Sequence, residues 1–428
     1  MNQHSLKKII LFMMLTAGLT ASLIWAQYPS VLSIDESPER LSKLISLQAD
    51  ILMIKEGRIY VVADWKDKDK LNLAGISFRD ESSRFPATPP RSAAIRTGIN
   101  GAYHSYPEVE QDLMELENLH PALARLEIIG QSHERRNIYA LKISDNPQNN
   151  EDEAEVLFLG CHHAREWISV EVPLFLARYL LNNYESDSAI HDLINSSEIW
   201  IVPLVNPDGL EYSIYYYRYW RKNRRDNGNG SFGVDLNRNY GFKWGYDSLG
   251  SSGDPDSFIY RGSNPFSEPE SQAVQSLVEA HDFQALVSYH NYTQVILFPW
   301  GYTNQRPPEY DLLKFLAGEM SQLMESVNNR PYDFGQSSIT SYLVNGDTSD
   351  WAYGQHGIPS FTFELPPQDY AGGGFFNSEA DILPICRENT PAAVYLIQWA
   401  VSQYEGDDIQ KRQTVRPDRK RDRVNSKK

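Results

Sequence analysis

The chain has 428 residues, of which 41% are hydrophobic and 22% are charged, and its formal net charge at pH 7 is −16. This length suits one large domain with appendages, and the apolar content is enough for a sizeable core, which excludes disorder of the whole chain. Nucleic-acid binders are usually basic because phosphate neutralisation dominates their affinity, so the acidic balance argues against a nucleic-acid partner.

The N-terminal residues have the pattern of a secretory signal peptide. Lys7 and Lys8 precede an apolar run over residues 9–25, and the small residue Ala26 closes the run as a cleavage site. A single membrane anchor is the alternative, because the run is only slightly short for a spanning helix. We predict a signal peptide over residues 1–26, a secreted or periplasmic location, and no stable membrane insertion after signal removal.

Residues 27–96 have a different character from the rest of the chain. Apolar runs at 51–54 and 59–62 flank a Glu-Gly pair, which is a hairpin signature. A polar, proline-rich stretch with exposed arginines follows at 79–91, and such linkers are easily cut by proteases. We predict a pro-segment and processing linker over 27–96, as in a zymogen. A stable accessory domain that is never removed is the alternative.

Residues 97–405 alternate between strand and helix patterns. Apolar runs predict strands at 138–143, 156–159, 199–204, 285–289, 295–298 and 360–363. Apolar spacings of three and four predict helices at 106–119, 168–181, 268–280, 310–327 and 390–404. Strands separated by helices indicate an α/β domain with a mixed, mostly parallel twisted sheet flanked by helices on both faces. Sites in such sheets form at the carboxyl ends of the strands.

The C-terminal residues and the cysteines carry less information. Residues 406–428 lose the hydrophobic period and are rich in lysine and arginine, which predicts a basic, disordered tail. Cys161 and Cys386 are the only cysteines, too few for a disulfide framework. They form either one bridge outside the cytoplasm or two buried thiols.

The segment 160–167 reads Gly-Cys-His-His-Ala-Arg-Glu-Trp, after a predicted strand and before a predicted helix. His163 and Glu166 are three residues apart and can face one metal ion, with His290 as the candidate third ligand at the end of another strand. Catalytic zinc takes three such protein ligands and keeps one position open. We expect His162 to be structural, because strand alternation directs it away from its neighbour. No His-Glu-x-x-His sequence occurs, so the common helical zinc-protease site is absent.

Six separated motifs occur in order between residues 99 and 404. They are His-Ala-Arg-Glu at 163–166, Trp-Arg-Lys at 220–222, Asp-Leu-Asn-Arg-Asn at 235–239, Ser-Tyr-His-Asn-Tyr at 288–292, Tyr342, and Phe-Thr-Phe-Glu-Leu at 361–365. In these motifs the chain resembles the zinc metallocarboxypeptidases, the pancreatic carboxypeptidase A and B family with its bacterial relatives. Each motif alone is ordinary, but all of them in order and on strand ends are improbable as an accident.

The resemblance implies one Zn²⁺ per chain, held by His163, Glu166 and His290 with water in the open position. The same two-histidine, one-glutamate set holds zinc in carboxypeptidase A. It also implies that Glu364 takes a proton from the attacking water and returns it to the leaving amine. Arg221 would polarise the scissile carbonyl and stabilise the oxyanion.

The resemblance also implies a set of substrate-binding residues. They are Arg165, Asn237, Arg238, Tyr292 and Tyr342. A two-pronged contact from Arg238, with donors from Asn237 and Tyr342, would recognise a terminal carboxylate, and Arg165 would bind substrate backbone further out. Asp235 would orient His163 through the second ring nitrogen of that histidine.

The segment 345–351 aligns with the family's specificity pocket. The position that is apolar in the A type and acidic in the B type is Ser349, which is neither. Asp347 lies two residues earlier and could receive a lysine or arginine side chain, an arrangement similar to that of bacterial carboxypeptidase T. We predict mixed apolar and basic specificity. The alternative is that Asp347 caps a turn and faces solvent.

Together these features predict a secreted, monomeric zinc metallocarboxypeptidase that hydrolyses the C-terminal peptide bond of peptides and proteins with a free carboxylate. One rival is a cell-wall peptide carboxypeptidase of the same family. Another is a catalytically silent peptide-binding homologue, which would be expected to have lost Glu364 or a metal ligand. A third is an adhesion module carried by the basic tail.

Overall fold

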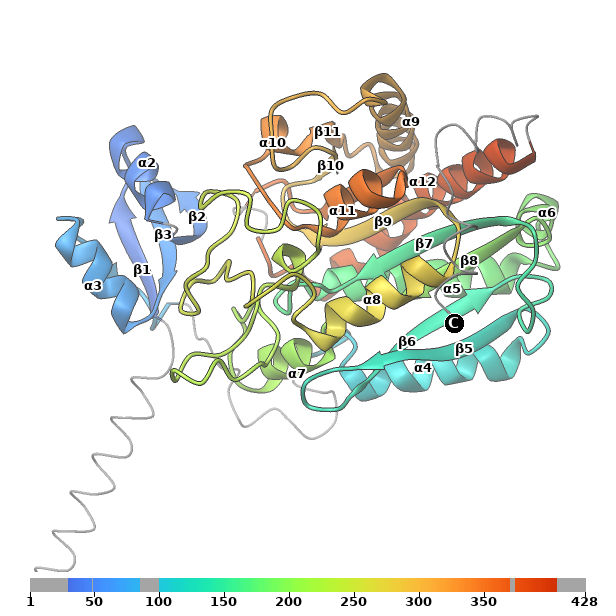
Figure 1. Cartoon of the computed structure of the whole chain (residues 1–428), viewed down its shortest axis with the longest axis horizontal. Coiled ribbons are helices and arrows are strands. Elements are labelled where there is room, and N and C mark those ends of the chain that lie inside the picture. Colours follow the sequence, from blue (N-terminus) through green and yellow to red (C-terminus); the bar gives the residue numbers. More distant parts are fainter. Residues whose placement is uncertain (1–29, 48, 85–99, 370–373, 406–428) are drawn as a thin grey trace, which may run out of the picture. The chain divides into compact units, whose positions relative to one another are not determined.

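The computed structural model describes residues 30–47, 49–84, 100–369 and 374–405 (Figure 1). The chain divides into two compact units, residues 1–89 and 90–428. The predicted signal peptide, the proline-rich part of the linker and the predicted basic tail lie outside the described residues. Every helix within the described ranges is too short or too polar to cross a membrane.

The first unit is a small antiparallel sheet with two helices. Its elements are β1 (Ser30–Asp35), α2 (Pro38–Ser46), β2 (Asp50–Lys55), β3 (Arg58–Ala63), α3 (Trp65–Leu73) and β4 (Arg79–Asp80), and the strand order is β2-β3-β1-β4. The predicted hairpin is confirmed as β2 and β3, joined at Glu56 and Gly57, which both have positive φ. The predicted linker begins too early, because Arg79 and Asp80 pair with β1.

The second unit contains an eight-stranded mixed sheet in the order β11-β10-β12-β9-β7-β8-β6-β5. The strands are β5 (Ala124–Gln131), β6 (Asn137–Ile143), β7 (Ala154–Gly160), β8 (Ser197–Val202), β9 (Phe283–Asn291), β10 (Val295–Phe298), β11 (Asp333–Gln336) and β12 (Ser360–Leu365). Strands β12, β9, β7 and β8 run parallel at the centre, which confirms the predicted α/β architecture. Their carboxyl ends therefore lie at one edge of the sheet.

Helices cover both faces of this sheet (Figure 1). They are α4 (Tyr106–Leu119), α5 (Ile168–Asn183), α6 (Ser188–Ile194), α7 (Pro207–Tyr215), α8 (Pro269–Ala280), α9 (Tyr310–Asn328), α10 (Ser337–Thr340), α11 (Thr348–His356) and α12 (Glu379–Glu405). Val156 and Phe158 of β7 pack in the core with α5, α9 and α12, whereas Leu157 and Leu159 pack in the core with α8 and α11. This alternation is the period of a strand buried on both faces.

Each predicted strand and helix of this unit is present; α4 and β10 have the predicted ends, and the other elements have shifted ends. The apolar pattern did not reveal β5, β11, α6, α7, α10 and α11. The last helix starts at Glu379, whereas the sequence predicted a start at Thr390. The prediction missed the first part of the helix because two internal prolines obscure its apolar spacing in the sequence. Cys161 and Cys386 are both buried and free, so the thiol alternative is the one the structure contains.

Candidate metal centre and active site

The loop after β7 directs two predicted ligands to the edge of the sheet. Gly160 ends the strand where a side chain has no room, since an added Cβ would lie 2.3 Å from the Ser169 carbonyl oxygen. Cys161 then takes a left-handed conformation with φ of 54°. A non-glycine residue in this region is uncommon and often lies at a functional site. The chain thereby turns sharply, and His163 and Glu166 follow before α5 begins.

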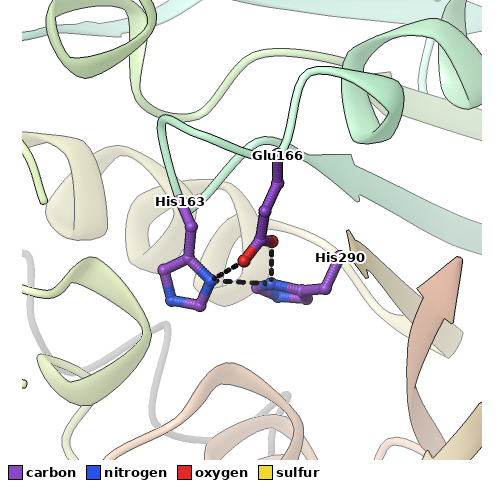
Figure 2. Close-up of side chains that lie close together, drawn as sticks. All are labelled: His163, Glu166 and His290. Atoms are coloured by element: carbon purple, nitrogen blue, oxygen red, sulfur yellow. Dashed lines mark hydrogen bonds and ion pairs between the residues drawn. The ribbon is translucent and has the colours of Figure 1, made fainter. Parts of the chain in front are cut away.

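His163, Glu166 and His290 converge at one point (Figure 2). Glu166 Oε1 lies 2.9 Å from His163 Nδ1, and Glu166 Oε2 lies 3.0 Å from His290 Nδ1. The two Nδ1 atoms are 3.1 Å apart. All three residues are at least 95% buried. Residues separated by more than a hundred positions are therefore brought together by the parallel pairing of β7 and β9.

The outer ring nitrogens show that these donor atoms fit a metal ion. His163 Nε2 lies 3.1 Å from Asp235 Oδ1, an oxygen that only accepts; with the proton on Nε2, Nδ1 keeps a lone pair for a metal ion. His290 Nε2 lies 3.0 Å from Ser288 Oγ, which accepts its proton when Nδ1 is a lone pair. Two imidazole nitrogens and a carboxylate then face one another without a proton between them. A divalent cation stabilises that arrangement, and the donor types suit zinc.

The pKa shifts of Glu166 and His290 also favour the binding of a metal ion. Burial alone would raise the pKa of Glu166, but the charges and hydrogen bonds of His163 and His290 outweigh burial and hold this pKa well below its ordinary value. Burial lowers the pKa of His290. An ionised carboxylate and a neutral imidazole are the forms that bind a metal ion.

Arg221 and Asp235 lie beside this cluster as a buried ion pair. Arg221 donates from Nε to Asp235 Oδ2 at 3.0 Å, and Nη2 lies 2.9 Å from the same oxygen. Arg221 Nη1 is 3.9 Å from Glu166 Oε1. Burial would raise the pKa of Asp235, but Arg221, Arg238 and His163 hold it well below its ordinary range. One carboxylate thus orients both a predicted ligand and the predicted carbonyl-polarising arginine.

The predicted carboxylate binders lie on the short 3₁₀ helix Leu236–Arg238 and a loop. Asn237 Oδ1 accepts from Thr348 N at 2.9 Å, so its Nδ2 points toward His290 at 3.4 Å. Arg238 is buried and held by the carbonyl oxygens of Gly250 and Asn237, at 2.8 and 2.7 Å. Tyr342, by contrast, is 57% exposed, between α10 and α11. Two of the three predicted residues are therefore fixed in place, and the third lies at the surface.

Glu364 lies near the carboxyl end of β12, directly paired with His290 in the parallel register. It is half-buried, and burial together with the Glu166 carboxylate raises its pKa well above its ordinary value. The positive charges of Arg221 and Arg238 act in the opposite direction. Glu364 is therefore close enough to Glu166, Arg221 and Arg238 for their charges to shift its pKa.

Arg165 and Tyr292 are placed by a common neighbour, Phe375. The Arg165 guanidinium lies over the Phe375 ring at 4.1 Å, and the Tyr292 ring meets the same ring edge-on at 4.9 Å. Such cation–π and edge-to-face contacts favour fixed orientations. Two predicted substrate-binding residues, Arg165 and Tyr292, thus contact the same aromatic ring.

The predicted specificity residues are both buried at the start of α11. Ser349 Oγ lies 2.8 Å from Thr362 Oγ1 of β12. Asp347 caps the helix, with Oδ2 accepting from Asp350 N at 3.3 Å. The other oxygen, Oδ1, is buried without a hydrogen-bond partner among the described residues. Burial raises the pKa of Asp347 to about 6. Asp347 therefore caps a helix, as the alternative interpretation expected, but it does not face solvent.

His162, which the sequence predicted to be structural only, also contacts the site. His162 lies fully buried beside His290, with ring centroids 5.5 Å apart and an interplanar angle of 17°. It contacts Ser288, Tyr240 and Thr348. The only sequence signal was the doubled histidine, because the other three residues lie 78 to 186 positions away along the chain.

An α/β sheet with a buried two-histidine, one-glutamate donor set at its strand ends is the arrangement of a mononuclear zinc hydrolase. The family profile described as zinc carboxypeptidase matches residues 109–392. The chain therefore belongs to the zinc carboxypeptidase family, as its sequence motifs indicated. It is a hydrolase that acts as an exopeptidase.

Individual relatives agree with this assignment. The chain is 34% identical over 293 residues to carboxypeptidase B of Astacus astacus, which covers 67% of this chain and 93% of the relative. It is 31% identical over 383 residues to a zinc carboxypeptidase of Saccharothrix mutabilis subsp. capreolus, covering 85% and 87%.

Solved structures support the same fold. The crystal structure of thrombin activatable fibrinolysis inhibitor has a TM-score of 0.72 and 28% identity, covering 87% of this chain and 99% of that chain. Carboxypeptidase A from Helicoverpa armigera has a TM-score of 0.70 and 25% identity, covering 88% and 98%. Both matches exceed the share of the chain that residues 90–428 supply, so part of the first unit has a counterpart in each.

Proposed function

We propose that this protein is a secreted zinc metallocarboxypeptidase that removes C-terminal residues from peptides and proteins with a free terminal carboxylate. The observation that carries the proposal is the buried convergence of His163, Glu166 and His290 next to two oriented arginines, Arg221 and Arg238. The three converging side chains suit a metal ion. Arg221 suits the charge of an oxyanion, and Arg238 suits the carboxylate of a chain end.

The three converging residues would hold one zinc ion per chain. When bound, zinc lowers the pKa of a water and polarises a carbonyl oxygen. Glu364 would accept the proton of that water and return it to the leaving amine. Its raised pKa suits this second task, because a carboxyl group that holds its proton more firmly is a better general acid near neutral pH.

Arg221 would stabilise the negative charge that develops on the scissile carbonyl oxygen. Its guanidinium is held from one side by Asp235, and Nη1 lies on the side of Glu166. A donor fixed in advance costs no reorganisation during the reaction, and such donors contribute roughly 3–4 kcal/mol each. Asp235 would act indirectly, through the orientation of Arg221 and His163.

Arg238, Asn237 and Tyr342 would bind the terminal carboxylate of the substrate. Arg238 is suited to a two-pronged contact, and the Asn237 amide presents Nδ2 because Thr348 occupies its oxygen. The exposed Tyr342 would close over the bound chain end. Arg165 and Tyr292 would contact the substrate further from its end.

The specificity pocket would accept both apolar and basic terminal side chains. Ser349 is small and its hydroxyl is engaged with Thr362, so it presents neither a large apolar surface nor a charge. Asp347 Oδ1 offers a buried acceptor that a lysine or arginine side chain could satisfy. A buried carboxylate oxygen without a partner is costly, which favours a cationic ligand.

The chain would be exported by a signal peptide over residues 1–26 and kept as a zymogen by residues 27–96. The folded first unit and the partial match of that unit to solved relatives support a pro-segment. Residues 97–405 would form the active, monomeric enzyme, and residues 406–428 a basic tail. Retention of Glu364 and of all three predicted ligands speaks against a silent binding protein.

The test is a hydrolysis panel of blocked dipeptides that end in Phe, Leu, Lys, Arg or Glu, each with and without a chelator. We expect cleavage after Phe, Leu, Lys and Arg, weak cleavage after Glu, and loss of all cleavage with the chelator. Full cleavage in the presence of chelator would overturn the metal role. Equal cleavage of all five ends would overturn the specificity.

A further inference from the structure

His162 has no proposed catalytic or substrate-binding role, although its ring has three hydrogen-bond partners in the site. It is fully buried, immediately before the predicted ligand His163. Its Nδ1 lies 3.1 Å from Ser288 Oγ, and its Nε2 lies 2.8 Å from Tyr240 Oη and 3.2 Å from Thr348 Oγ1. Both ring nitrogens are therefore engaged, and they contact different parts of the site.

The Nδ1 side leads to the metal centre. Ser288 Oγ lies 3.0 Å from His290 Nε2 as well as 3.1 Å from His162 Nδ1. When His290 binds a metal ion through Nδ1, its Nε2–H donates a hydrogen bond to Ser288 Oγ. The serine hydroxyl must then donate its own hydrogen bond to His162 Nδ1. His162 Nδ1 thus accepts the hydrogen bond of the serine hydroxyl that orients His290.

The Nε2 side leads to the binding site for the chain end. Thr348 Oγ1 donates to Asn237 Oδ1 at 2.8 Å, because an amide oxygen only accepts. The threonine oxygen can therefore accept from His162 Nε2. Thr348 N also donates to Asn237 Oδ1, at 2.9 Å, so the two bonds fix which way the amide points.

We propose that His162 is a positioning residue that couples the metal ligand His290 to the carboxylate-binding Asn237. A single neutral tautomer, with the proton on Nε2, suits both sides of the ring: Nδ1 accepts from Ser288 Oγ, and the one proton on Nε2 is shared between Tyr240 Oη at 2.8 Å and Thr348 Oγ1 at 3.2 Å. No other neutral side chain of this shape has an acceptor and a donor on opposite sides of a rigid ring. This inference rests on the proposed function, since it assumes that His290 binds zinc and Asn237 binds a carboxylate.

Three substitutions separate the two sides of the ring. His162→Asn keeps an acceptor near the Nδ1 position, and His162→Gln keeps a donor near the Nε2 position. His162→Leu removes both. Zinc affinity is measured by competition with a chromogenic chelator, which requires no turnover, and kcat and KM are measured on a blocked dipeptide that ends in phenylalanine.

The expected results differ between the variants. His162→Asn keeps zinc affinity within about threefold of wild type and raises KM, whereas His162→Gln loses zinc affinity and keeps KM closer to wild type. His162→Leu loses about 10-fold or more in zinc affinity and also raises KM, in line with the cost of removing partners of metal ligands. Ser288→Ala reproduces the zinc loss, and adding it to His162→Leu causes little further loss because the two act in one chain.

Tyr289→Phe is the matched control. Tyr289 lies on β9 between Ser288 and His290, is fully buried, and has a hydroxyl without a hydrogen-bond partner in the described part of the chain. We expect this variant to keep the zinc affinity and KM of wild type. Changes in Tyr289→Phe as large as those in His162→Leu would overturn the proposal, since they would reflect general disturbance of the core.

The proposal is also overturned if His162→Leu binds zinc and substrate as wild type does, or if the Asn and Gln variants lose both properties equally. If no His162 variant folds, Ser288→Ala and Thr348→Val carry the same test, one for zinc and one for KM. Absence of zinc uptake by the wild-type chain would overturn the proposed metal site itself. Wild-type zinc uptake with an unaffected His162→Leu would overturn the positioning role alone.

Discussion

At the scale of residues, the site consists of charges and lone pairs that are unfavourable without a cation. His163, Glu166 and His290 present acceptors to one another at about 3 Å, inside a region with almost no solvent contact. Burying such groups without compensation is costly, so their convergence is itself an argument for a bound metal ion. Asp235 and Arg221 add a balanced ion pair beside the three donors.

Glu364→Gln tests the proposed proton carrier. Glutamine keeps the shape but cannot take a proton, so we expect kcat to fall by about 10²–10⁴-fold. Zinc content should remain at one per chain, because Glu364 is not among the three converging donors. Metal analysis and steady-state kinetics check both, with the exposed Glu379→Gln as control. A kcat within a few fold of wild type would remove Glu364 from the mechanism.

Asp347→Asn tests the basic half of the specificity. A hydrogen bond to a charged group contributes about 1.5–3 kcal/mol, so the ratio of kcat/KM for lysine over phenylalanine ends should fall by about 10-fold or more. In the wild type this ratio should rise as pH increases from 5 to 7, because the carboxyl of Asp347, with a pKa of about 6, loses its proton over that range. A pH-dependent ratio that persists in the Asn variant would contradict the assignment.

At the scale of elements, the amino end of α8 anchors the loop that carries Arg221. Glu268, the residue before the helix, is fully buried and binds Arg225 at 2.6 Å, His133 at 2.7 Å and Asn223 at 2.8 Å. An acidic group is favoured at a helix N-terminus, where the helix dipole is positive. The network thus fixes the loop that carries Arg221, the proposed oxyanion-stabilising residue, against the start of α8.

This network predicts a pH-dependent stability. Burial would raise the pKa of Glu268, but its hydrogen bonds with His133, Ser267, Asn223 and Arg225 lower it from 4.5 to about 2. The folded state then holds the proton less tightly than the unfolded state. The ionised Glu268 therefore adds to the free energy of unfolding, on the order of 3 kcal/mol in total. This stabilisation is complete above pH 4.5 and is lost as pH falls toward 2.

Glu268→Gln should remove this dependence. Denaturant unfolding between pH 2 and 6 measures it, and we expect the variant to be less stable near pH 6 and to lose less stability on acidification than the wild type. Glu279→Gln, on the exposed side of the same helix, is the control. Parallel stability curves for Glu268→Gln and wild type would contradict the account.

The sequence predicted those features that depend on local pattern. Buried strands and long helices follow from the apolar period, and the candidate metal ligands follow from short motifs at strand ends. The sequence did not predict β11, which has no apolar period, or the role of His162, whose partners Thr348 and Tyr240 are distant along the chain. Strand alternation also failed beyond Gly160, because the left-handed Cys161 ends the regular strand. Contacts made only by tertiary packing leave no periodic signal.

At the scale of the whole molecule, the chain joins a small antiparallel unit to a large α/β unit by a segment rich in proline and arginine. If the first unit is a pro-segment, limited proteolysis with a trypsin-like enzyme should cut near Arg84, Arg91 or Arg96. We then expect a fragment close to residues 97–428 with at least 10-fold higher activity on blocked dipeptides. Mass spectrometry locates the cut. Cleavage without a change in activity would favour a permanent accessory domain.

The central claim is that one buried metal ion and a binding site for a chain end act on the same peptide bond. Its most direct measurement compares a peptide with a free terminal carboxylate and the same peptide amidated at its end, for enzyme with one zinc per chain and for enzyme stripped by chelator. We expect release of the last residue only from the free acid and only with zinc, and recovery of activity when zinc is returned. Equal cleavage of the amidated peptide, or undiminished cleavage by the stripped enzyme, would contradict it.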